Sequence, residues 1–544
     1  MEMHFATMWE QISEVVPDQP VLINGDNIKT WREYDDRAAR LASALTEHGL
    51  AAGAKIGLYI YNSNEYQEAQ YAIFKISACP INVNYRYQED ELVYLLDNSD
   101  SEALIYHACF ADRIEAIKSR LPDIKLYIQI DDDSAEALLE GSLDYETLIA
   151  QHDPMPRIER SSDETYMLYT GGTTGMPKGV MYNMGEFCNG MFMGYTLAGM
   201  PEPISVEETV AAVTKLKEDK NNPVTLVCCP LMHGTGVWLG SMVPMLMGGT
   251  VVTIHNHKLD AHELWQAVQT HKVKNIVIVG DAFARPMLDA LDEAKEAGNP
   301  YDISSVASMQ SSGVMWTTEV KQGLLEHHDM MLVDALGATE GSMGKSVMMR
   351  GMEANTAKFI INDTTKVFSE DGRLIAPGSG EIGLVANGGF CPIGYYKDPE
   401  KSAATFKVID GARYSFPGDY ATVETDGTIT LLGRGSMSIN TMGEKVYPEE
   451  VEEAIKTHTD IYDCLVVGVK DPKFNERITA LVSYSKGGSV SEDDLIDHVK
   501  QRLSSYKKPK NVFFVDKVQR AINGKADYKW AKARAVELYT NLTA

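Results

Sequence analysis

Apolar strands alternate with amphipathic helices through the first half of the chain, and this alternation restricts the fold more than any other feature. Residues 31–50 carry apolar side chains at helical spacing, residues 55–60 have the pattern of a strand, and residues 65–76 form a second helical pattern. Strands joined by helices build βαβ units, in which helices cover mostly parallel sheets. The sequence therefore predicts an α/β body. Further strand patterns lie at 103–106, 125–130, 275–280 and 330–336.

The second half of the chain changes character twice. Around residues 378–387 and 421–432 the strands are short and linked by turns, which predicts a small antiparallel β sub-barrel. Residues 433–436 (Gly-Arg-Gly-Ser) then form a predicted hinge, and a compact α+β pattern follows. We expect an N-terminal body, 1–435, and a small mobile C-terminal domain, 436–544. Within that domain helices are predicted at 448–457 and 492–503, and strands at 464–469 and 478–484.

The chain of 544 residues carries 50 basic and 77 acidic side chains, a net charge of −27. A surface this acidic repels a polyanion, which argues against a general nucleic-acid-binding protein. The excess lies in residues 1–435, because residues 436–544 hold 17 basic and 16 acidic side chains. The tail is locally basic between residues 500 and 534. This suits an anionic ligand such as a nucleotide or a phosphorylated carrier, although a solvated helix face has the same pattern.

Seven cysteines are present without a CxxC pair, which argues against a disulfide scaffold or a zinc site and favours a reducing compartment. The first 17 residues are amphipathic and carry two glutamates, unlike a secretory signal. Residues 221–257 contain no Lys, Arg, Asp or Glu, but Pro230, Pro244 and five glycines interrupt them. A buried strand–loop–helix–strand unit explains this stretch better than a membrane span. We therefore expect a cytoplasmic protein without a transmembrane segment.

The strongest local motif is Tyr169-Thr-Gly-Gly-Thr-Thr-Gly-Met-Pro-Lys-Gly179. Its glycines allow backbone N–H groups to surround an anion, its threonines add hydroxyl donors, and Lys178 adds a positive charge. The segment predicts a phosphate-binding loop. It is not a Walker A loop, which requires GxxxxGK[ST] leading into a helix. Because the sequence has no GxSxG elbow and no convincing Ser/His/Asp or Cys/His set, no protein nucleophile is predicted.

Together with further motifs, this loop resembles the signature of the adenylate-forming superfamily, which includes acyl-CoA synthetases, beetle luciferases and peptide-synthetase adenylation domains. The resemblance covers nearly the whole chain, and the motifs stand in the family's order. Residues 82–87, 280–283 and 443–450 look most similar to bacterial ligases for fatty acids and steroid side-chain carboxylates. The other motifs are 230–234, 312–315, 334–340, 394–400, 418–419, 433–434, 443–448 and 524–525.

The resemblance implies a ligase that works in two steps. A carboxylate attacks the α-phosphate of ATP to give acyl-AMP and pyrophosphate, and the thiol of coenzyme A then attacks the acyl carbon and releases AMP. Both nucleophiles arrive with the substrates, so catalysis rests on positioning and charge stabilisation. We expect ATP, Mg²⁺ and coenzyme A as cofactors and a small carboxylic acid as substrate. Two alternatives remain open: an acyl-AMP ligase that loads the phosphopantetheine of a carrier protein, and a catalytically silent nucleotide-binding homologue. A homodimer is also left open.

The resemblance also implies roles for individual residues at the nucleotide. Thr339 would contact the α-phosphate, Glu340 would bind Mg²⁺, and Lys525 would reach the attacking carboxylate. Asp419 would accept hydrogen bonds from the ribose hydroxyls, and Arg434 would steady the ribose and phosphate. The other residues expected at ATP are Thr170, Gly171, Gly172, Thr173, Thr174 and Lys178 at the phosphates, and Gly313, Val314, Asp334, Ala335 and Leu336 at the adenine, with Asp334 reading its amino group.

For the second step, the resemblance implies that the C-terminal domain turns about residues 435–436. The loop at 440–446, which includes Gly443 and Lys445, would then line the pantetheine tunnel and displace Lys525. His233 stands where the family gates this tunnel with an aromatic ring. We favour that steric role over general-base catalysis.

By resemblance, apolar side chains line the acyl pocket. With methionines supplying adaptable volume, this lining predicts a hydrophobic carboxylate, either of medium to long chain or with bulky rings. Asp281 is the polar exception and is expected to face either solvent or a substrate hydroxyl. Leu336 replaces the tyrosine that usually stacks on adenine, and Ser436 replaces the usual Asp or Lys of the hinge. The predicted pocket residues are Trp238, Met242, Val279, Ala282, Phe283 and Met343, together with Gly313 and Leu336.

Overall fold

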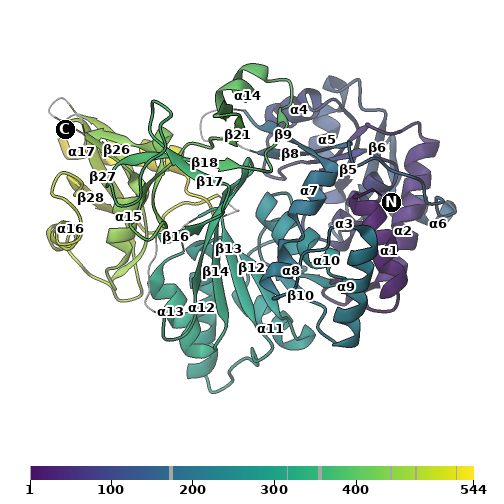
Figure 1. The fold of residues 1–544 in the computed structure, drawn as a ribbon, viewed down its shortest axis with the longest axis horizontal. Coiled ribbons are helices and arrows are strands. Elements are labelled where there is room, and N and C mark those ends of the chain that lie inside the picture. Colours follow the sequence, from purple (N-terminus) through teal and green to yellow (C-terminus); the bar gives the residue numbers. More distant parts are fainter. Residues whose placement is uncertain are drawn as a thin grey trace.

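The computed structural model describes residues 2–170, 176–314, 316–352, 358–441, 444–471, 474–521 and 524–543. Figure 1 shows a large body that contains the N-terminus and a smaller unit at the opposite end that contains the C-terminus. The body combines helix-covered parallel sheets with an antiparallel region, and the smaller unit is a separate C-terminal domain with its own sheet. The predicted α/β fold is therefore confirmed.

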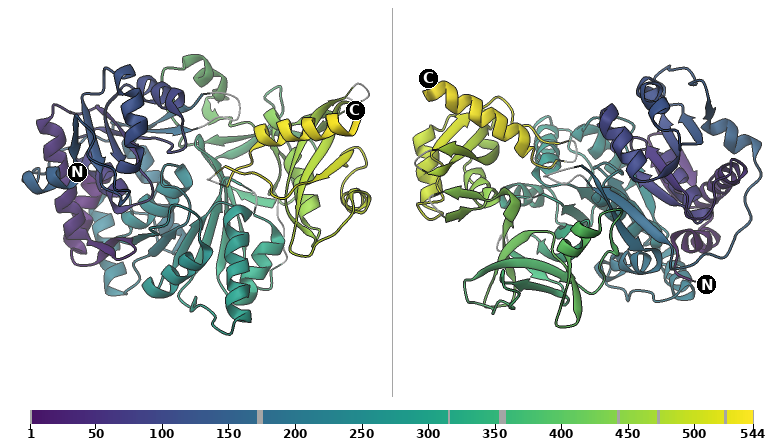
Figure 2. Two further views of the ribbon diagram at one scale, coloured as in Figure 1. Left: turned by 180° about the vertical axis from the view of Figure 1, so that it is seen from behind. Right: turned by 90° about the horizontal axis from the view of Figure 1, so that it is seen from above.

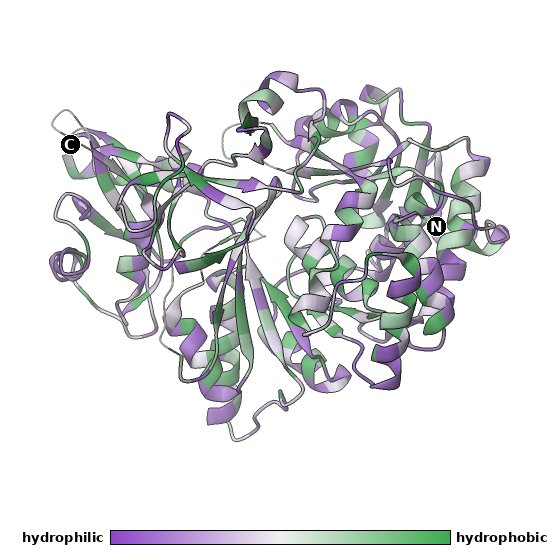
Figure 3. Ribbon diagram, viewed as in Figure 1, coloured by the Kyte–Doolittle hydropathy of each residue, from purple (hydrophilic) through white to green (hydrophobic). Residues whose placement is uncertain are grey.

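The largest sheet runs through the centre of the body (Figure 1). Its strands are short apolar runs, such as Asn-Ile-Val-Ile at 275–278, which is typical of parallel strands buried on both faces. Figure 3 shows these central strands coloured mostly as hydrophobic residues. In order, the parallel strands are β1 (Pro20–Asn24), β11 (Thr250–Thr253), β10 (Val224–Val227), β12 (Asn275–Ile278), β13 (Ser308–Ser312) and β14 (Met331–Ala338).

The antiparallel region continues the same sheet from β14. β15 (Gly341–Met348) pairs antiparallel with β14, and β16 (Lys358–Ile361) pairs antiparallel with β15. From β16 the strand order continues to β20, and among the described residues its two ends do not pair with each other. At the other edge, β2 (Asn27–Thr30) pairs antiparallel with β1. The remaining antiparallel strands are β23 (Ile429–Arg434), β22 (Asp419–Val423), β18 (Ile382–Gly388), β17 (Thr365–Phe368), β21 (Ala412–Ser415) and β20 (Phe406–Ile409).

Two smaller sheets complete the body. A parallel five-stranded sheet is formed near the N-terminus, and a three-stranded antiparallel sheet carries the glycine-rich motif between two of its strands. The first contains β4 (Cys79–Asn82), β3 (Lys55–Tyr59), β5 (Ser101–His107), β6 (Leu126–Ile130) and β7 (Ser142–Asp144). The second contains β19 (Gly394–Tyr395), β9 (Lys178–Asn183) and β8 (Thr165–Thr170).

Helices cover these sheets, and side-chain caps fix several of their starts. Thr30 and Glu33 form a reciprocal capping box at the start of one helix, and Asn183 caps another. The helices are α1 (Phe5–Val15), α2 (Trp31–Glu47), α3 (Asn64–Lys75), α4 (Glu89–Asn98), α5 (Ala111–Ile117), α6 (Tyr145–Gln151), α7 (Met184–Gly190), α8 (Met193–Leu197), α9 (Val206–Glu218), α10 (Val243–Leu246), α11 (Ala261–His271), α12 (Asp281–Glu296), α13 (Thr318–His327) and α14 (Pro399–Thr405).

The uncharged stretch at 221–257 folds as predicted, as a buried strand–loop–helix–strand unit. It contains β10, the π-helical turn η3 (Thr235–Met242), α10 and β11. Gly236 is required in this turn, because a Cβ there would overlap the carbonyl of Pro230. In the described part of the chain, no helix has the length and apolar character that a membrane span requires.

The C-terminal domain has its own sheet and its own apolar clusters, whose buried members all lie between Ile439 and Ala535. Figure 2 shows its last helix lying along one side of this sheet. The predicted second helix is shorter than expected, ending at Lys500. The strands are β25 (Glu444–Val446), β24 (Ile439–Thr441), β27 (Asn475–Tyr484), β26 (Ile461–Asp471) and β28 (Asn511–Phe514), and the helices are α15 (Pro448–Lys456), α16 (Glu492–Lys500) and α17 (Tyr528–Thr543).

Candidate functional site

A cavity of about 190 Å³ lies at the carboxyl ends of the parallel strands of the large sheet. Val279 follows β12, Ser312 ends β13, and the segment from Ala335 to Thr339 reaches the cavity from β14. Thr170, at the end of β8, joins them from the three-stranded sheet. Ligand sites of open α/β sheets lie at these strand ends. The fold therefore creates a ligand site here.

Two asparagines hold the loop around Pro230 against this cavity. Asn82 Nδ2 donates to the carbonyl oxygens of Tyr169 (2.8 Å) and Met232 (2.7 Å), and its Oδ1 accepts from the Tyr169 N–H at 2.7 Å. Asn62 makes one hydrogen bond to the backbone on either side of Pro230, at 3.0 and 2.7 Å. Side-chain amides that satisfy several backbone groups hold a loop in one conformation. They therefore fix the segment that contains the predicted gate.

The C-terminal domain places Lys525 in this cavity. The residue before it, Gly524, has φ +74° and packs closely on the body, because a Cβ at Gly524 would lie 2.9 Å from the Cβ of Ala282. At the other end of the lysine side chain, a Cβ at Gly313 would lie 3.6 Å from Lys525 Cε. The glycine at 524 thus allows the segment to approach the body closely, and the lysine side chain is in van der Waals reach of Gly313.

Charged side chains surround the tip of Lys525. Burial lowers its pKa and the positive charge of Arg434 lowers it further, while the carboxylates of Glu340 and Asp419 oppose the shift. Arg434 Nε lies 3.3 Å from Asp419 Oδ1. The other oxygen of this nearly buried carboxylate, Oδ2, has no hydrogen-bond partner among the described residues. An acceptor left unpaired in this way is expected to meet a donor on a ligand.

Thr339 and Glu340 are held by aromatic side chains. The Tyr182 hydroxyl donates to the Thr339 carbonyl, and the Tyr395 hydroxyl donates to Glu340 Oε1 at 2.7 Å. The Ser415 hydroxyl donates to the Glu340 carbonyl at 2.8 Å. These bonds fix both residues at the turn between β14 and β15, where Thr339 lines the cavity.

Lys178, at the start of β9, forms an ion pair with Asp398 at an Nζ–Oδ2 distance of 2.6 Å. Asp398 also caps the first turn of α14. Of the other predicted phosphate and tunnel residues, Gly171, Gly172, Thr173, Thr174 and Gly443 lie outside the described residues. Lys445 lies in β25, where its backbone alone is described.

The predicted adenine wall is divided between the cavity and the core. Gly313, Ala335 and Leu336 line the cavity, whereas Val314 packs against the main apolar core. Asp334, one residue before Ala335, is buried and accepts a hydrogen bond from Lys321 Nζ at 3.3 Å. Burial raises the pKa of Asp334 to about 6, and the lysine opposes this rise.

His233 lines the cavity beside Lys525. Burial and the charge of Lys525 lower the pKa of His233 to about 3. An imidazole with this pKa is neutral near pH 7 and is a weak proton acceptor. The surroundings of His233 thus favour a steric gate over a general base.

The residues predicted for the acyl pocket separate into three groups. Trp238 and Val279 line the cavity with Leu336 and Gly313, and Trp238 Nε1 donates to the Tyr166 hydroxyl at 2.9 Å. Met242 and Met343 are fully buried in apolar clusters. Ala282 and Phe283 line a second cavity. Met242 and Met343 therefore line neither cavity.

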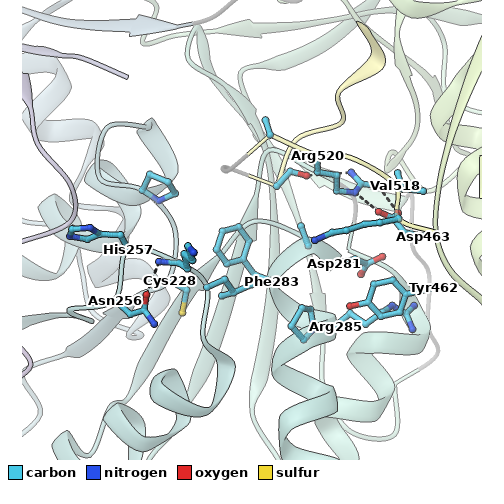
Figure 4. A pocket seen from close by; sticks show the side chains of 18 of the residues that line it. Cys228, Asn256, His257, Asp281, Phe283, Arg285, Tyr462, Asp463, Val518 and Arg520 are labelled. Carbon is cyan, nitrogen blue, oxygen red and sulfur yellow. Dashed lines mark hydrogen bonds and ion pairs between the residues drawn. The ribbon is translucent and has the colours of Figure 1, made fainter. Parts of the chain in front are cut away.

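That second cavity, of about 590 Å³, lies between the body and the C-terminal domain. Figure 4 shows His257 and Phe283 of the body on one side and Asp463 and Arg520 of the C-terminal domain on the other. Pro230 lines both cavities. The larger cavity thus adjoins the smaller one at the loop that carries His233.

Sequence reasoning missed one wall of the smaller cavity. Phe187, Gly190, Met191 and Met193, from α7, α8 and the turn between them, line it together with Phe390. The methionine-rich run at 184–200 was the available signal. The wall is apolar and adjoins Trp238, which indicates that an apolar ligand group extends in this direction.

Comparisons with known proteins agree with this site. The sequence family described as AMP-binding enzyme matches residues 9–391, and the one described as AMP-binding enzyme C-terminal domain matches residues 450–525. Among solved structures, the anthranilate CoA ligase AuaEII in complex with anthranoyl-AMP has a TM-score of 0.84 and 21% identity, over 99% of this chain and 98% of that chain. At this identity the likeness shows the shared fold.

Two curated relatives match the whole length. The 3-oxocholest-4-en-26-oate–CoA ligase of Rhodococcus rhodochrous is 40% identical over 99% of this chain and 98% of its own. The medium/long-chain-fatty-acid–CoA/3-oxocholest-4-en-26-oate–CoA ligase of Mycolicibacterium smegmatis is 39% identical over 98% of this chain and 96% of its own. The chain therefore belongs to the family of AMP-binding enzymes and is an AMP-forming acid–thiol ligase of its acyl-CoA synthetase branch.

Proposed function

We propose that this ligase uses ATP and Mg²⁺ to activate a medium- to long-chain hydrophobic carboxylic acid and passes the acyl group to coenzyme A. The observation that carries the proposal is one shared cavity. Lys525 enters it from the C-terminal domain, Thr170 and Thr339 supply a polar side, and Phe187 and Met191 supply an apolar wall. Such a space suits a phosphate and an apolar acyl chain that meet at one lysine.

At the nucleotide, we assign the ribose to Asp419 and Arg434. The unpartnered Oδ2 of Asp419 can accept from a ribose hydroxyl, while the contact between Oδ1 and Arg434 orients the carboxylate. Asp334 is assigned to the adenine amino group and Lys178 to the terminal phosphates. In both cases ATP would compete with the protein partner that now holds the charge, Lys321 or Asp398.

We assign Mg²⁺ to Glu340. Tyr395 orients its carboxylate through one oxygen at 2.7 Å. Within the described part of the chain, no group of three or more His, Cys, Asp or Glu side chains is arranged to hold a metal ion. A single carboxylate still fits, because Mg²⁺ in nucleotide sites takes one or two carboxylates and completes its shell with phosphate oxygens and water. Bound there, the ion would neutralise phosphate charge.

The two cavities support an alternation between the half-reactions. Gly524 lines the larger cavity and Lys525 the smaller, so this segment separates them. If the domain 436–544 turns about 435–436, one movement withdraws the lysine and opens a path for a thiol past His233. The loop at 440–446, with Gly443 and Lys445, is assigned to the place that Lys525 leaves.

Cavity size supports a flexible acyl chain. The smaller cavity measures about 190 Å³, below the ~300 Å³ at which pockets for drug-sized ligands begin. An extended alkyl chain can follow the wall of α7 and α8, whereas a fused ring system requires that wall to move. Methionines at 191 and 193 can adapt to chains of different length.

A second candidate substrate is a steroid side-chain carboxylate. Both relatives have 3-oxocholest-4-en-26-oate in their names, and one also has medium and long fatty acids. In such a substrate the carboxylate ends a flexible side chain, which suits a cavity of about 190 Å³. The ring system would then occupy the space that opens when the wall of α7 and α8 moves.

A competition experiment tests the proposal. The purified protein is incubated with ATP, Mg²⁺, coenzyme A and an equimolar pool of acetate, decanoate, palmitate, phenylpropanoate and 3-oxocholest-4-en-26-oate, and acyl-CoA and acyl-AMP are measured by mass spectrometry. Decanoyl- or palmitoyl-CoA as the main product supports the proposal. The steroid thioester as the main product replaces it with the second candidate. Acyl-AMP without thioester would move the acceptor to a carrier-protein phosphopantetheine.

We place the reaction in the cytoplasm. All seven cysteines are unpaired, the state that a reducing compartment maintains. Fractionation of the native host with antibody detection tests this location, and recovery of the protein outside the cytoplasmic fraction would contradict it.

A further inference from the structure

The C-terminal domain is docked on the first two turns of α12. Lys456 Nζ lies 3.7 Å from Asp281 Oδ2, and the guanidinium carbon of Arg285 lies 5.5 Å from the centroid of the Tyr462 ring. Gly524 packs against the same turns. Figure 4 shows Asp281 and Arg285 of α12 close to Tyr462 of the C-terminal domain. The Gly524–Lys525 segment and the contacts of Lys456 and Tyr462 therefore all rest on the start of α12.

Asp281 is fixed in place by the body. Its Oδ1 accepts from the Thr317 N–H at 2.9 Å and from the Thr317 hydroxyl at 3.2 Å. Its Oδ2 accepts no hydrogen bond from the described residues and faces Lys456. The Asp281 and Lys456 side chains are 9% and 5% exposed. A carboxylate buried to this extent needs a cation nearby, and Lys456 supplies one.

A series of polar contacts leads from this pair to the backbone beside Lys525. Lys456 Nζ lies 3.4 Å from Asp463 Oδ1, and Asp463 holds the Arg520 guanidinium with two bonds at 2.6 and 2.7 Å. Arg520 Nη1 in turn donates to the Gly524 carbonyl at 3.3 Å. Asp281 is the member that the body contributes, and the other members belong to the C-terminal domain.

We propose that Asp281 is a positioning residue for the adenylation step: it holds Lys456 and thereby fixes the Gly524–Lys525 segment in the cavity. The proposal rests on the adenylation role of Lys525 proposed above. It replaces both earlier expectations for Asp281, solvent and a substrate hydroxyl, with a contact between the domains.

The contact belongs to one arrangement of the two domains. A rotation about 435–436 carries Lys456, Asp463 and Arg520 away together, because they lie within one domain and pair with one another. Asp281 remains behind on α12. Its pairing therefore stabilises the arrangement with Lys525 in the cavity and contributes nothing after the domain has turned.

The test measures the two half-reactions separately. Decanoyl-AMP formation from decanoate and ATP is compared with decanoyl-CoA formation from supplied decanoyl-AMP and coenzyme A, in the full-length protein. The variants are Asp281→Asn, which keeps an acceptor for Thr317, Lys456→Met, and Lys456→Arg, which keeps a cation between Asp281 and Asp463. Arg477→Met is the matched control, because it breaks a buried ion pair with Asp471 (2.8 Å) inside the C-terminal domain.

We expect Asp281→Asn and Lys456→Met to lose about 10²-fold in acyl-AMP formation, the cost of misplacing a catalytic group by ~1 Å, with thioester formation within about two-fold of wild type. Lys456→Arg should recover at least about ten-fold of the rate that Lys456→Met loses, since it keeps a cation between Asp281 and Asp463. Arg477→Met should show no such selectivity.

Equal loss of both half-reactions, or the same selective loss in Arg477→Met, would overturn the proposal. Failure of Lys456→Arg to recover activity while its thermal unfolding matches that of wild type would do so too. Lys525→Ala, measured alongside, separates the two levels of the argument. If it is not selective for acyl-AMP formation, the proposed role of Lys525 is wrong. If it is selective and the Asp281 and Lys456 variants are not, the docking contact is wrong.

Discussion

The assignment of Asp419 to the ribose predicts a strong preference for ATP over deoxy-nucleotides, which Asp419→Asn abolishes. In wild type, Oδ1 contacts Arg434 and Oδ2 is free to accept from a ribose hydroxyl. A hydrogen bond to a charged acceptor contributes about 1.5–3 kcal/mol. At 1.36 kcal/mol per decade, loss of one such bond lowers kcat/KM by about 10- to 150-fold.

The substitution is chosen to keep the contact with Arg434. Asparagine retains one carbonyl oxygen for the guanidinium and places an NH₂ donor where Oδ2 stood. The variant is therefore expected to lose about the same factor with ATP, while its rates with ATP, 2′-deoxy-ATP and 3′-deoxy-ATP become equal within about three-fold. Acyl-AMP formation by wild type and variant, each with ATP and one deoxy-nucleotide, supplies the four corners of a cycle. The two deoxy-nucleotides give two such cycles, and the coupling in each isolates the contact with one hydroxyl.

Asp426→Asn is the matched control, because Asp426 pairs at 2.7 Å with Lys358 on the outer surface near the β22–β23 turn. It should leave the nucleotide preference unchanged. If wild type accepts both deoxy-nucleotides as well as it accepts ATP, the ribose assignment is refuted. It is refuted equally if Asp419→Asn keeps the full preference, because the discriminating group must then be another residue.

Three further predictions concern the lysine, the acyl wall and the pH dependence. Lys525→Ala should lose about 10²–10³-fold in acyl-AMP formation and keep thioester formation from supplied acyl-AMP. Rapid-quench mass spectrometry of each half-reaction measures both rates, and equal losses in the two would contradict the prediction. Gly190→Leu should raise KM for palmitate about 60-fold relative to octanoate, because excluding about three methylenes costs ~2.4 kcal/mol, whereas Gly190→Ala fits at 3.5 Å from Phe390 and should change little. Unchanged chain-length preference would remove α7 from the acyl wall. Burial raises the pKa of Glu449 from 4.5 to about 8, and the negative charges of Glu452 and Asp419 add to the rise. Between these two pH values, Glu449 is protonated when the domain is docked and ionised when the side chain is exposed. Docking of the C-terminal domain on the body should therefore weaken as the pH rises from about 4.5 to about 8, and it should level off above pH 8. Glu449→Gln should flatten the decline of acyl-AMP formation between about pH 4.5 and pH 8, and an unaltered pH profile would contradict this.

Local pattern predicted much of the architecture. The βαβ alternation, the uncharged buried unit and the separate α+β domain all follow from periodicity and turn residues that act over a few positions. The polar side of the cavity could be predicted from the family resemblance of the motifs that contain Thr170 and Thr339. Thr339 follows β14 at the edge where the parallel strands of the large sheet end, whereas Thr170 comes from the antiparallel three-stranded sheet.

The acyl wall was harder to predict, because an apolar residue has the same pattern whether it packs a core or lines a cavity. Met242 and Met343 are fully buried in apolar clusters, while Met191 and Met193 reach the cavity. All four are methionines in apolar surroundings, and only the path of the backbone separates them. Phe283 was likewise predicted to line the acyl pocket, but it lines the cavity between the domains.

Asp281 shows how far such reasoning reaches and where it stops. A carboxylate among apolar pocket residues implies a partner, because an unpaired buried charge costs several kcal/mol. The C-terminal domain offers 17 lysines and arginines as partners, and their order in the chain does not distinguish them. The fold does so by placing Lys456, the last residue of α15, near Asp281, the first residue of α12. Asp463 and Arg520 then connect the pair to the backbone beside Lys525. A residue that looked misplaced in the acyl pocket is thereby explained by a domain that begins more than a hundred residues later.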